Sequence, residues 1–258
     1  MDDETTATGQ PTTPRTATPR PVTPRPATPR AQARERTMRR IVELGNAQLV
    51  ECGAGGLSVR EIARGLGMVS SAVYRYVRSR DELLTLLIVD AYGDLADAVD
   101  GALAEASDAP RERFTALAES MAQWAIAHPE RWTLLYGTPV SGYDAPAEST
   151  NADGTRVMAR MLAIAADADA DADAGASAGR GEGVHVTPDV RALLDAHLEE
   201  FGVESDAMAA MRAVTAWSSL VGIISAHVFR QLGADAAAIG EQILGSQTEL
   251  LADLVIGR

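Results

Sequence analysis

The sequence predicts an all-α fold. Apolar residues recur three or four positions apart along most of the 258 residues, which is the period of helices that bury one face. No stretch shows the strict apolar–polar alternation that is typical of a strand. Gly and Pro residues interrupt the periodic stretches at separate points, so we expect a series of helices joined by loops.

The most specific pattern lies between Leu57 and Leu83 and reads LSVREIARGLGMVSSAVYRYVRSRDEL. The Ser58 hydroxyl is expected to cap a helix, and Glu61, three residues later, completes a capping box. Gly67 ends this helix, because glycine adopts a left-handed backbone at the lowest cost. A second short helix follows at once. Two short helices joined by a tight turn form a helix-turn-helix, which places its second helix in the major groove of DNA.

The net charge of −13 is unevenly distributed. Residues 1–80 hold 13 Arg and 7 acidic residues, a net charge of +6, whereas residues 81–258 hold 10 Arg and 29 acidic residues, a net charge of −19. The basic part coincides with the helix-turn-helix, and the acidic remainder discourages non-specific binding to nucleic acid.

The composition also predicts a protein of the reducing cytoplasm. A single cysteine, Cys52, excludes an internal disulfide. The N-terminus opens on acidic residues without an apolar run, which is not a secretory signal. The longest uncharged stretch, between Arg212 and Arg230, falls short of the roughly 20 apolar residues of a membrane span, so we expect a buried helix there and no membrane partner.

Three domains are expected along the chain. Residues 1–32 are a basic tail in which Thr-Pro-Arg recurs with a period of five. Pro at this density predicts disorder, and the alternative is an arm whose Arg residues contact phosphates or the minor groove. Residues 33–80 form the helix-turn-helix domain, and residues 81–258 form a helical body. Within the body we expect a disordered loop at 167–186, where Asp and Ala alternate without the spacing of a calcium loop.

The expected helices are read from apolar periodicity, caps and Pro positions. They span about 33–51, 80–106, 111–128, 129–136, 153–166, 188–200, 205–231 and 235–256, with a loop at 137–152.

Residues 34–84 resemble the TetR family of bacterial transcriptional regulators. The matching residues are Ile41, Gly53, Leu57-Ser58, Ile62-Ala63, Gly67, Val73-Tyr74, Tyr76 and Arg80-Asp81-Glu82-Leu83. Residues 124–143 resemble the C-terminal domain of the family's Trp-His-Gly branch, through Trp124, His128-Pro129, Arg131-Trp132, Leu135-Tyr136-Gly137 and Gly142-Tyr143. Gly45 and Arg80 depart from the family, which often has Ala and Lys at these positions.

The resemblance implies a recognition helix from about Ser70 to Tyr76, capped by Ser70 or Ser71. Small side chains near its start face the bases, so specificity depends on Arg75, on water or on DNA shape. The Tyr74 hydroxyl is implied to reach a phosphate. The candidates for contact with double-stranded DNA are Ser58, Arg60, Val69, Ser70, Ser71, Ala72, Tyr74, Arg75, Tyr76 and Arg80.

The resemblance also implies a homodimer on a near-palindromic operator, with the last two helices as the interface. The candidates there are Ala213, Trp217, Leu220, Ile224, Ile243 and Leu250, and the alternative is that these residues form an intramolecular core.

The middle helices are expected to enclose a pocket for a small apolar or aromatic effector, whose binding lowers DNA affinity by a population shift. The candidate lining residues are Met121, Trp124, His128, Trp132, Tyr136, Tyr143, Met158, Met161 and Phe201. The Met and aromatic residues have the alternative reading of ordinary core residues, and His128 has the alternative of capping the end of a helix through a bond to a carbonyl.

Three other classes of protein compete with a regulator of this kind. An enzyme is disfavoured, because no phosphate loop, nucleotide fingerprint, nucleophile elbow or metal pair is present, and we expect neither cofactor nor metal. A DNA-packaging protein is disfavoured by the acidic body. A redox sensor depends on Cys52, which we expect to pack as a small apolar side chain.

Overall fold

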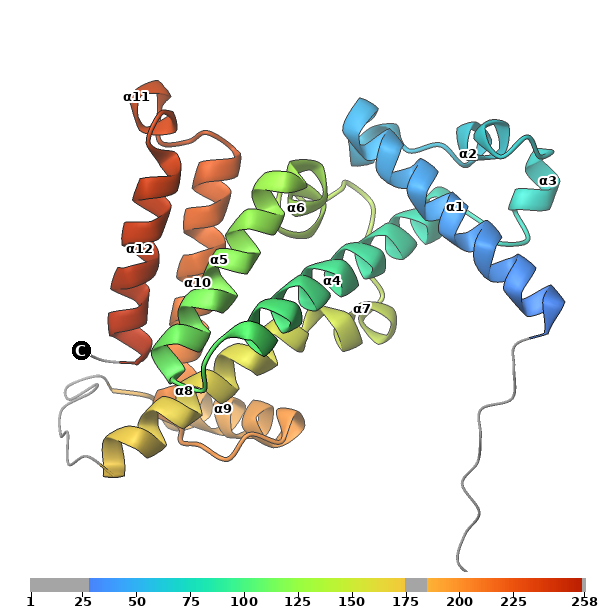
Figure 1. Cartoon of the computed structure of the whole chain (residues 1–258). Coiled ribbons are helices and arrows are strands. Elements are labelled where there is room, and N and C mark those ends of the chain that lie inside the picture. Colours follow the sequence, from blue (N-terminus) through green and yellow to red (C-terminus); the bar gives the residue numbers. More distant parts are fainter. Residues whose placement is uncertain (1–27, 175–184, 257–258) are drawn as a thin grey trace, which may run out of the picture. The chain divides into compact units, whose positions relative to one another are not determined.

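The computed structural model describes residues 28–174 and 185–256, and every regular element in these ranges is a helix (Figure 1). The chain divides into two units, Met1–Thr37 and Met38–Arg258. In the first unit, the described residues form the beginning of α1 (Pro29–Cys52). The predicted all-α class is confirmed.

Helix α1 begins earlier than the sequence predicts, at Pro29 instead of about residue 33. Proline is well suited to the first turn of a helix, because it has no N–H to leave unpaired. The Thr28 hydroxyl accepts a hydrogen bond from the Ala31 N–H at 3.3 Å. The last residues of the expected tail are therefore helical, and residues 1–27 lie outside the described residues.

Four short or medium helices build the N-terminal part of the second unit together with the start of α4. They are the second-unit part of α1, the 3-10 turn η1 (Ala54–Gly56), α2 (Val59–Gly65) and α3 (Ser70–Val73). Their apolar faces meet in one core, in which Ile41, Val73 and Leu83 are fully buried. This core gives α2 and α3 a fixed mutual geometry.

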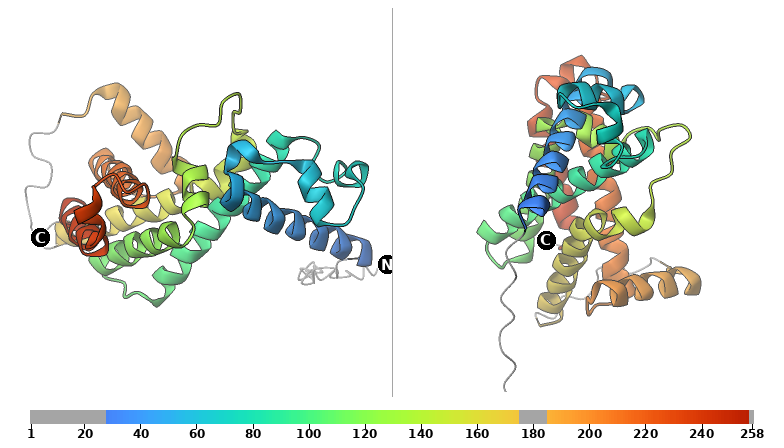
Figure 2. Two further views of the ribbon diagram at one scale, coloured as in Figure 1. Left: turned by 90° about the horizontal axis from the view of Figure 1, so that it is seen from above. Right: turned by 90° about the vertical axis from the view of Figure 1, so that its right-hand side faces the viewer.

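The remaining helices form the body of the second unit (Figures 1 and 2). They are α4 (Arg80–Glu105), α5 (Pro110–Ala127), α6 (Pro129–Tyr136), α7 (Ala147–Gly154), α8 (Arg156–Ala174), α9 (Pro188–Phe201), α10 (Ala207–Val228), α11 (Ala234–Ala237) and α12 (Gly240–Val255). Their buried side chains form a second core cluster.

Two segments that the sequence predicts as loops are helical. Helix α7 lies within the expected loop 137–152, and α8 extends through residues 167–174 of the expected disordered loop. In α8, Asp167 pairs with Arg113 at 3.2 Å and Asp169 pairs with Arg212. The alternation of Asp with Ala, the best helix former, therefore continues a helix in which Asp167 and Asp169 have partners. Residues 175–184 of the expected loop lie outside the described residues.

Helix α10 is a core helix of the body. Among the described helices it is the one long and apolar enough to cross a membrane by length and composition. Ala213, Leu220 and Ile224 on its inner face are completely buried against neighbouring helices. Intramolecular packing accounts for the apolar residues of this inner face.

Candidate nucleic-acid interface

Helix α2 begins at Ser58, as predicted. The Ser58 hydroxyl accepts a hydrogen bond from the Glu61 N–H at 3.4 Å, so this residue is the N-cap. The reciprocal half of the capping box is missing. The Ser58 N–H instead donates to Gln48 Oε1 at 2.8 Å, while Gln48 Nε2 donates to the Ser58 carbonyl at 3.3 Å. Glu61 pairs with Arg64 instead. The side chain that binds the start of α2 is therefore Gln48 of α1.

The turn between α2 and α3 depends on Gly67, whose φ is +64°. The Gly67 N–H donates to the Arg64 carbonyl and the Met68 N–H donates to the Ala63 carbonyl, both at 3.0 Å. This pair of bonds is a Schellman motif, which satisfies the last carbonyls of α2 and reverses the chain sharply. The predicted helix-turn-helix is confirmed in its geometry.

Helix α3 is shorter than the predicted recognition helix. It ends at Val73, and residues 74–76 form a turn. Its N-cap is Val69, which makes no side-chain hydrogen bond, so the expectation that Ser70 or Ser71 caps it is wrong. The hydroxyls of Ser70 and Ser71 therefore do not cap this helix.

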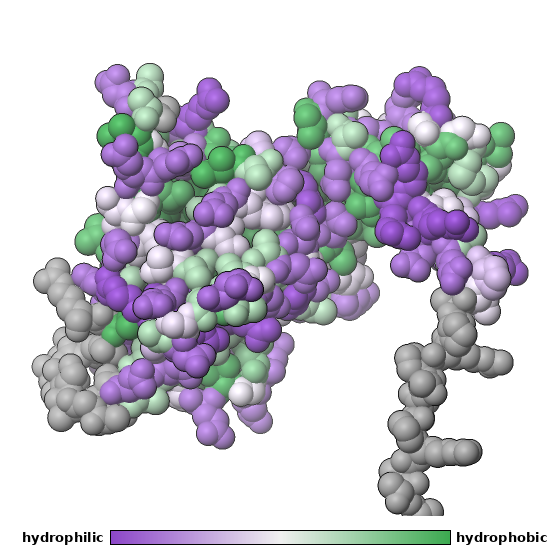
Figure 3. All heavy atoms as spheres, in the orientation of Figure 1, coloured by the Kyte–Doolittle hydropathy of each residue, from purple (hydrophilic) through white to green (hydrophobic). Residues whose placement is uncertain are grey.

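The candidate DNA contacts differ in exposure. Val73 faces the core, which turns the opposite side of α3 outward. Val69 is 71% exposed and Tyr74 is 40% exposed. The surface around α2 and α3 shows hydrophobic side chains beside hydrophilic ones (Figure 3). Of the other candidates, Arg60, Ser71 and Arg75 are exposed, and Ser58, Ser70, Ala72, Tyr76 and Arg80 are half-buried.

Arg80, at the start of α4, has carbonyl partners within the chain. Its Nη2 donates to the Ala54 carbonyl at 2.7 Å and to the Gly55 carbonyl at 3.3 Å. These bonds join α4 to the 3-10 turn η1. A guanidinium has five N–H donors, so these two bonds leave further donors for an anion.

The start of α4 carries a cap that the sequence interpretation missed. The Ser79 hydroxyl accepts the Glu82 N–H at 3.0 Å, and Glu82 Oε2 accepts the Arg78 N–H at 2.5 Å. The spacing Ser-x-x-Glu was the signal that could have found it. This cap begins the long helix directly after the helix-turn-helix.

A polar network, which we call the Arg131 network, joins α1 to the body. Arg131 of α6 is 8% exposed. Its Nη2 donates to Asp90 Oδ2 at 2.9 Å and its Nη1 donates to Asp94 Oδ2 at 2.6 Å. Asp90 also accepts from Asn46 Nδ2 of α1 at 3.2 Å, and Asp94 accepts from Trp124 Nε1 of α5 at 3.1 Å. Side chains of α1, α5 and α6 thus donate hydrogen bonds to two carboxylates of α4.

The charges and hydrogen bonds of the Arg131 network lower the pKa of Asp94. Burial alone raises the pKa of Asp94, but the hydrogen bond from Trp124 and the charge of Arg131 together lower that pKa below its usual value. The Arg131 guanidinium also lies 5.2 Å from the Trp124 ring centroid, within range of a cation–π interaction. Among the described residues, Arg131 Nε and Asn46 Oδ1 are buried without a hydrogen-bond partner. The network is therefore satisfied only in part.

Tyr143, an expected pocket residue, lies in a different environment. Its hydroxyl is 2.8 Å from Thr85 Oγ1 of α4, and its ring packs against the core shared by α1–α3 and the start of α4. The loop after α6 thereby contacts α4 close to the helix-turn-helix.

The other expected pocket residues pack closely together. Met121, Trp132 and Met161 are completely buried in the core of the body, and Trp132 Nε1 donates to Ser225 Oγ at 3.1 Å. The Tyr136 ring lies 4.4 Å from the Trp132 ring and 6.2 Å from the Trp217 ring. Burial raises the pKa of Tyr136 well above its usual value. Of the remaining candidates, Trp124 is buried, and His128, Met158 and Phe201 are half-buried.

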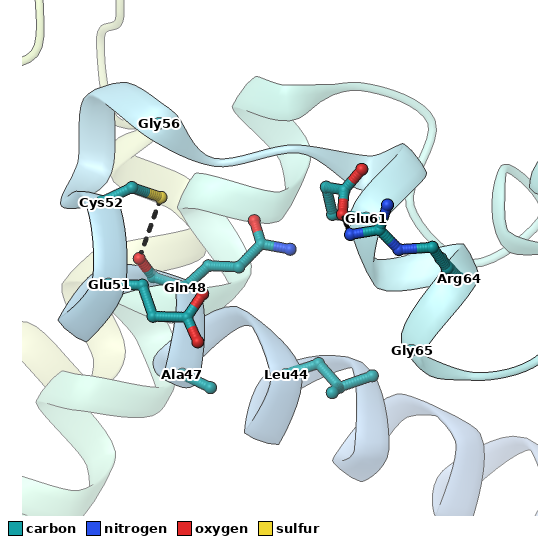
Figure 4. Close-up of a pocket in the computed structure, with 9 residues that line it drawn as sticks. All are labelled: Leu44, Ala47, Gln48, Glu51, Cys52, Gly56, Glu61, Arg64 and Gly65. Atoms are coloured by element: carbon teal, nitrogen blue, oxygen red, sulfur yellow. Dashed lines mark hydrogen bonds and ion pairs between the residues drawn. The ribbon is translucent and has the colours of Figure 1, made fainter.

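Cys52 is exposed, which contradicts the expectation that it packs as an apolar side chain. It lies at the end of α1, directly before Gly53 and the 3-10 turn η1. Its thiol donates to the Gln48 carbonyl at 3.1 Å and borders a pocket of about 300 Å³ between α1 and α2 (Figure 4). Glu61 and Arg64 line the other side of this pocket.

Together, the Schellman turn, the outward face of α3 and the fixed start of α2 define a helix-turn-helix protein. The sequence profile described as "Bacterial regulatory proteins, tetR family" matches residues 41–87. The profile described as "Tetracyclin repressor-like, C-terminal domain" matches residues 114–246. The chain belongs to the TetR family of DNA-binding transcriptional regulators.

Relatives and solved structures agree with this assignment. The HTH-type transcriptional regulator Rv1816 of Mycobacterium tuberculosis is 45% identical over 85% of this chain and 92% of its own length. Mb1846 of Mycobacterium bovis, also named an HTH-type transcriptional regulator, has the same identity and coverage. The crystal structure of the regulatory protein SCO4313 has a TM-score of 0.63 and 33% identity, over 85% of this chain and 98% of that one. All-α class, DNA binding and transcription regulation are thereby confirmed.

Proposed function

We propose that this protein is a homodimeric repressor that binds a near-palindromic operator and is released by a small apolar or aromatic molecule. The observation that carries the proposal is the outward face at the start of α3, where Val69 and Ser71 are exposed on a rigid helix-turn-helix. Their side chains are free to enter a major groove. Binding takes place in the cytoplasm, where the operator lies.

In this proposal, different side chains contact the bases and the phosphates. Val69, Ser71 and the half-buried Ser70 and Ala72 face base edges, which short side chains approach closely. Arg60, Tyr74 and Arg75 contact phosphates, and Tyr76 and Ser58 support them from less exposed positions. Arg80 contacts a phosphate only with the donors that Ala54 and Gly55 leave available.

Burial within one chain removes three residues from the predicted dimer interface. Ala213, Leu220 and Ile224 are completely buried within one chain, so they cannot meet a partner. Trp217 and Ile243 are half-buried, and Leu250 is 67% exposed. The outward faces of α10 and α12 therefore supply the interface, with Val214 and Leu254, 36% and 43% exposed, beside the predicted residues.

We further propose that the Arg131 network transmits effector binding to the DNA-binding helices. Met121, Trp132, Met158 and Met161 lie in or against the core of the body, so an apolar effector must separate them. Arg131 precedes Trp132 in α6, and a shift of α6 would disturb the bonds from Arg131 to Asp90 and onward to Asn46. Such a shift changes the separation of the two recognition helices in a dimer.

Assignment to the Trp-His-Gly branch belongs to the same proposal. The centroids of the Trp124 and His128 rings lie 5.3 Å apart. A Cβ atom at Gly137 would collide with the Thr133 carbonyl, so this position favours glycine. The ring contact and the lack of space for a side chain at Gly137 support this assignment.

Selection of bound sites from random DNA by the purified protein tests the proposal. We expect enrichment of an inverted repeat with half-sites about one helical turn apart. Arg75→Gln should lower the slope of log affinity against log salt concentration by about one, as for one lost phosphate contact. Glu105→Gln, at the far end of α4, is the control. Equal enrichment of all sequences would refute the proposal.

A further inference from the structure

A groove of about 430 Å³ lies between α5 and α12. This volume lies within the range of small-molecule sites. Its floor is apolar, with Ala122 and Leu244 buried and Ile126 39% exposed at the side. Glu119, Gln123 and Glu241 stand around it and are exposed. The groove thus joins an apolar surface to two carboxylates.

Thr248 supplies a polar group from within the wall of the groove. It is only 3% exposed, and no described residue forms a hydrogen bond with its hydroxyl. Other hydroxyls of α10 and α12, those of Thr215, Ser218 and Ser246, donate to the carbonyl four residues before them. The Thr248 hydroxyl borders the groove without such a partner, so it is available to a bound molecule.

The carboxylates determine the sign of the charge that the groove attracts. Neither Glu119 nor Glu241 is in an ion pair with a described residue, whereas Glu249, further along α12, pairs with Arg111 at 2.8 Å. Two unpaired carboxylates beside an apolar floor complement a molecule with an apolar body and a positive charge. From this complementarity we propose that the groove binds a small organic cation, such as a substituted ammonium ion.

The groove remains open in the proposed dimer. Residues 241, 244, 245 and 248 face the groove. The exposed apolar residues Ile239, Leu250 and Leu254, 49%, 67% and 43% exposed, project from the opposite side of α12, because successive helix residues are about 100° apart. The site is therefore separate from the interface and does not depend on the proposed release from DNA.

Gly245 allows the groove to be filled without disturbing the fold. A Cβ atom at this position meets no atom within 4 Å. Replacement of a helix-interior glycine also favours the helix. Gly245→Leu should therefore occupy the groove and leave the melting temperature unchanged or higher.

The test is calorimetric titration of the full-length protein, without DNA, with benzyldimethylammonium, which carries one N–H donor, and its uncharged isostere isobutylbenzene. We expect the cation to bind more tightly than the isostere. Glu119→Gln and Glu241→Gln should each weaken binding by about two- to fivefold, as for a partly exposed ion pair. Thr248→Val should weaken binding without loss of stability, and Gly245→Leu should abolish it.

The control is Glu199→Gln, which makes the same change of charge on the exposed surface of α9. This variant should bind like the wild type. Absence of binding, equal binding of the two probes, or binding retained in Gly245→Leu would overturn the proposal. Because no DNA is present, each of these results leaves operator binding untouched.

Discussion

Arg230 is the one non-glycine residue with a positive φ, +55°, among the described residues. It follows α10, where its N–H donates to the His227 carbonyl at 3.0 Å and the Gln231 N–H donates to the Ala226 carbonyl at 2.9 Å. These bonds place Arg230 at the left-handed position of a Schellman motif, where glycine is favoured.

Arg230→Gly should therefore raise the free energy of unfolding by up to about 1 kcal/mol, because it removes the strain of a left-handed side chain. Denaturant unfolding measures the change. Gly202→Ala makes the opposite substitution at φ +63° after α9 and should lower the same free energy by about 1 kcal/mol. A loss of stability in Arg230→Gly would contradict this account.

Asp94 links stability to pH. Its pKa is lowered in the folded protein, so its contribution to stability is complete above the ordinary carboxyl pKa of about 3.9 and is lost as the pH falls through the lowered value. The difference in unfolding free energy between the wild type and Asp94→Asn should be largest near neutral pH and shrink below about pH 4.

Unfolding of both proteins across this pH range measures the effect. Asp108→Asn, at an exposed residue before α5, is the matched control. A difference between the wild type and Asp94→Asn that stays constant with pH would exclude the contribution of Asp94.

At the scale of elements, helix α8 shows how partners turn a low-complexity run into a helix. Arg212 of α10 is about nine-tenths buried, and Asp169 of α8 is its partner. Asp171, one step further along the same alternation, is exposed. The same residue type therefore has different roles two positions apart.

Asp169→Ala should lower the free energy of unfolding by about 2–3 kcal/mol, because it leaves a buried guanidinium without its carboxylate. Asp171→Ala should change it by less than about 0.5 kcal/mol. Thermal or denaturant unfolding of the two variants measures these changes. Equal changes in the two variants would show that the pair of Asp169 with Arg212 adds nothing to the free energy of unfolding.

The helix-turn-helix elements show a second consequence of long-range contacts. Periodicity and caps in the sequence predict α2, Gly67 and the start of α4 closely. They do not predict that Gln48 replaces Glu61 as the partner of the Ser58 N–H, since residues ten positions apart meet only after α1 and α2 pack. Long-range packing also accounts for the shorter α3, because the turn at residues 74–76 places Val77 in the core.

At the scale of the whole molecule, the uneven distribution of charge along the sequence is consistent with the DNA-binding regulator that the family assignment gives, and the exposed apolar residues of α10 and α12 are consistent with the proposed dimer. The acidic body keeps non-specific DNA away from every surface but the N-terminal basic part. The exposed apolar residues of α10 and α12 are then available for a second copy of the chain.

Leu250→Glu should convert the proposed dimer to a monomer, because it places a charge in the apolar centre of the interface. Sedimentation at several concentrations measures this change, and operator affinity should fall with it. Leu193→Glu makes the same substitution on α9, at a residue 58% exposed, and should leave the dimer intact. A wild-type protein that sediments as a monomer would refute the interface.

The sequence by itself determined the helical class, the helix-turn-helix and the family, since these depend on local periodicity, caps and turn residues. Only the tertiary structure decided which apolar residues face inward. Met121, Trp132, Ala213 and Leu220 have the composition of a pocket or an interface, yet they are closed within one core. A helical pattern defines an apolar face, but whether that face meets the chain's own helices, a ligand or a second chain depends on packing between distant segments.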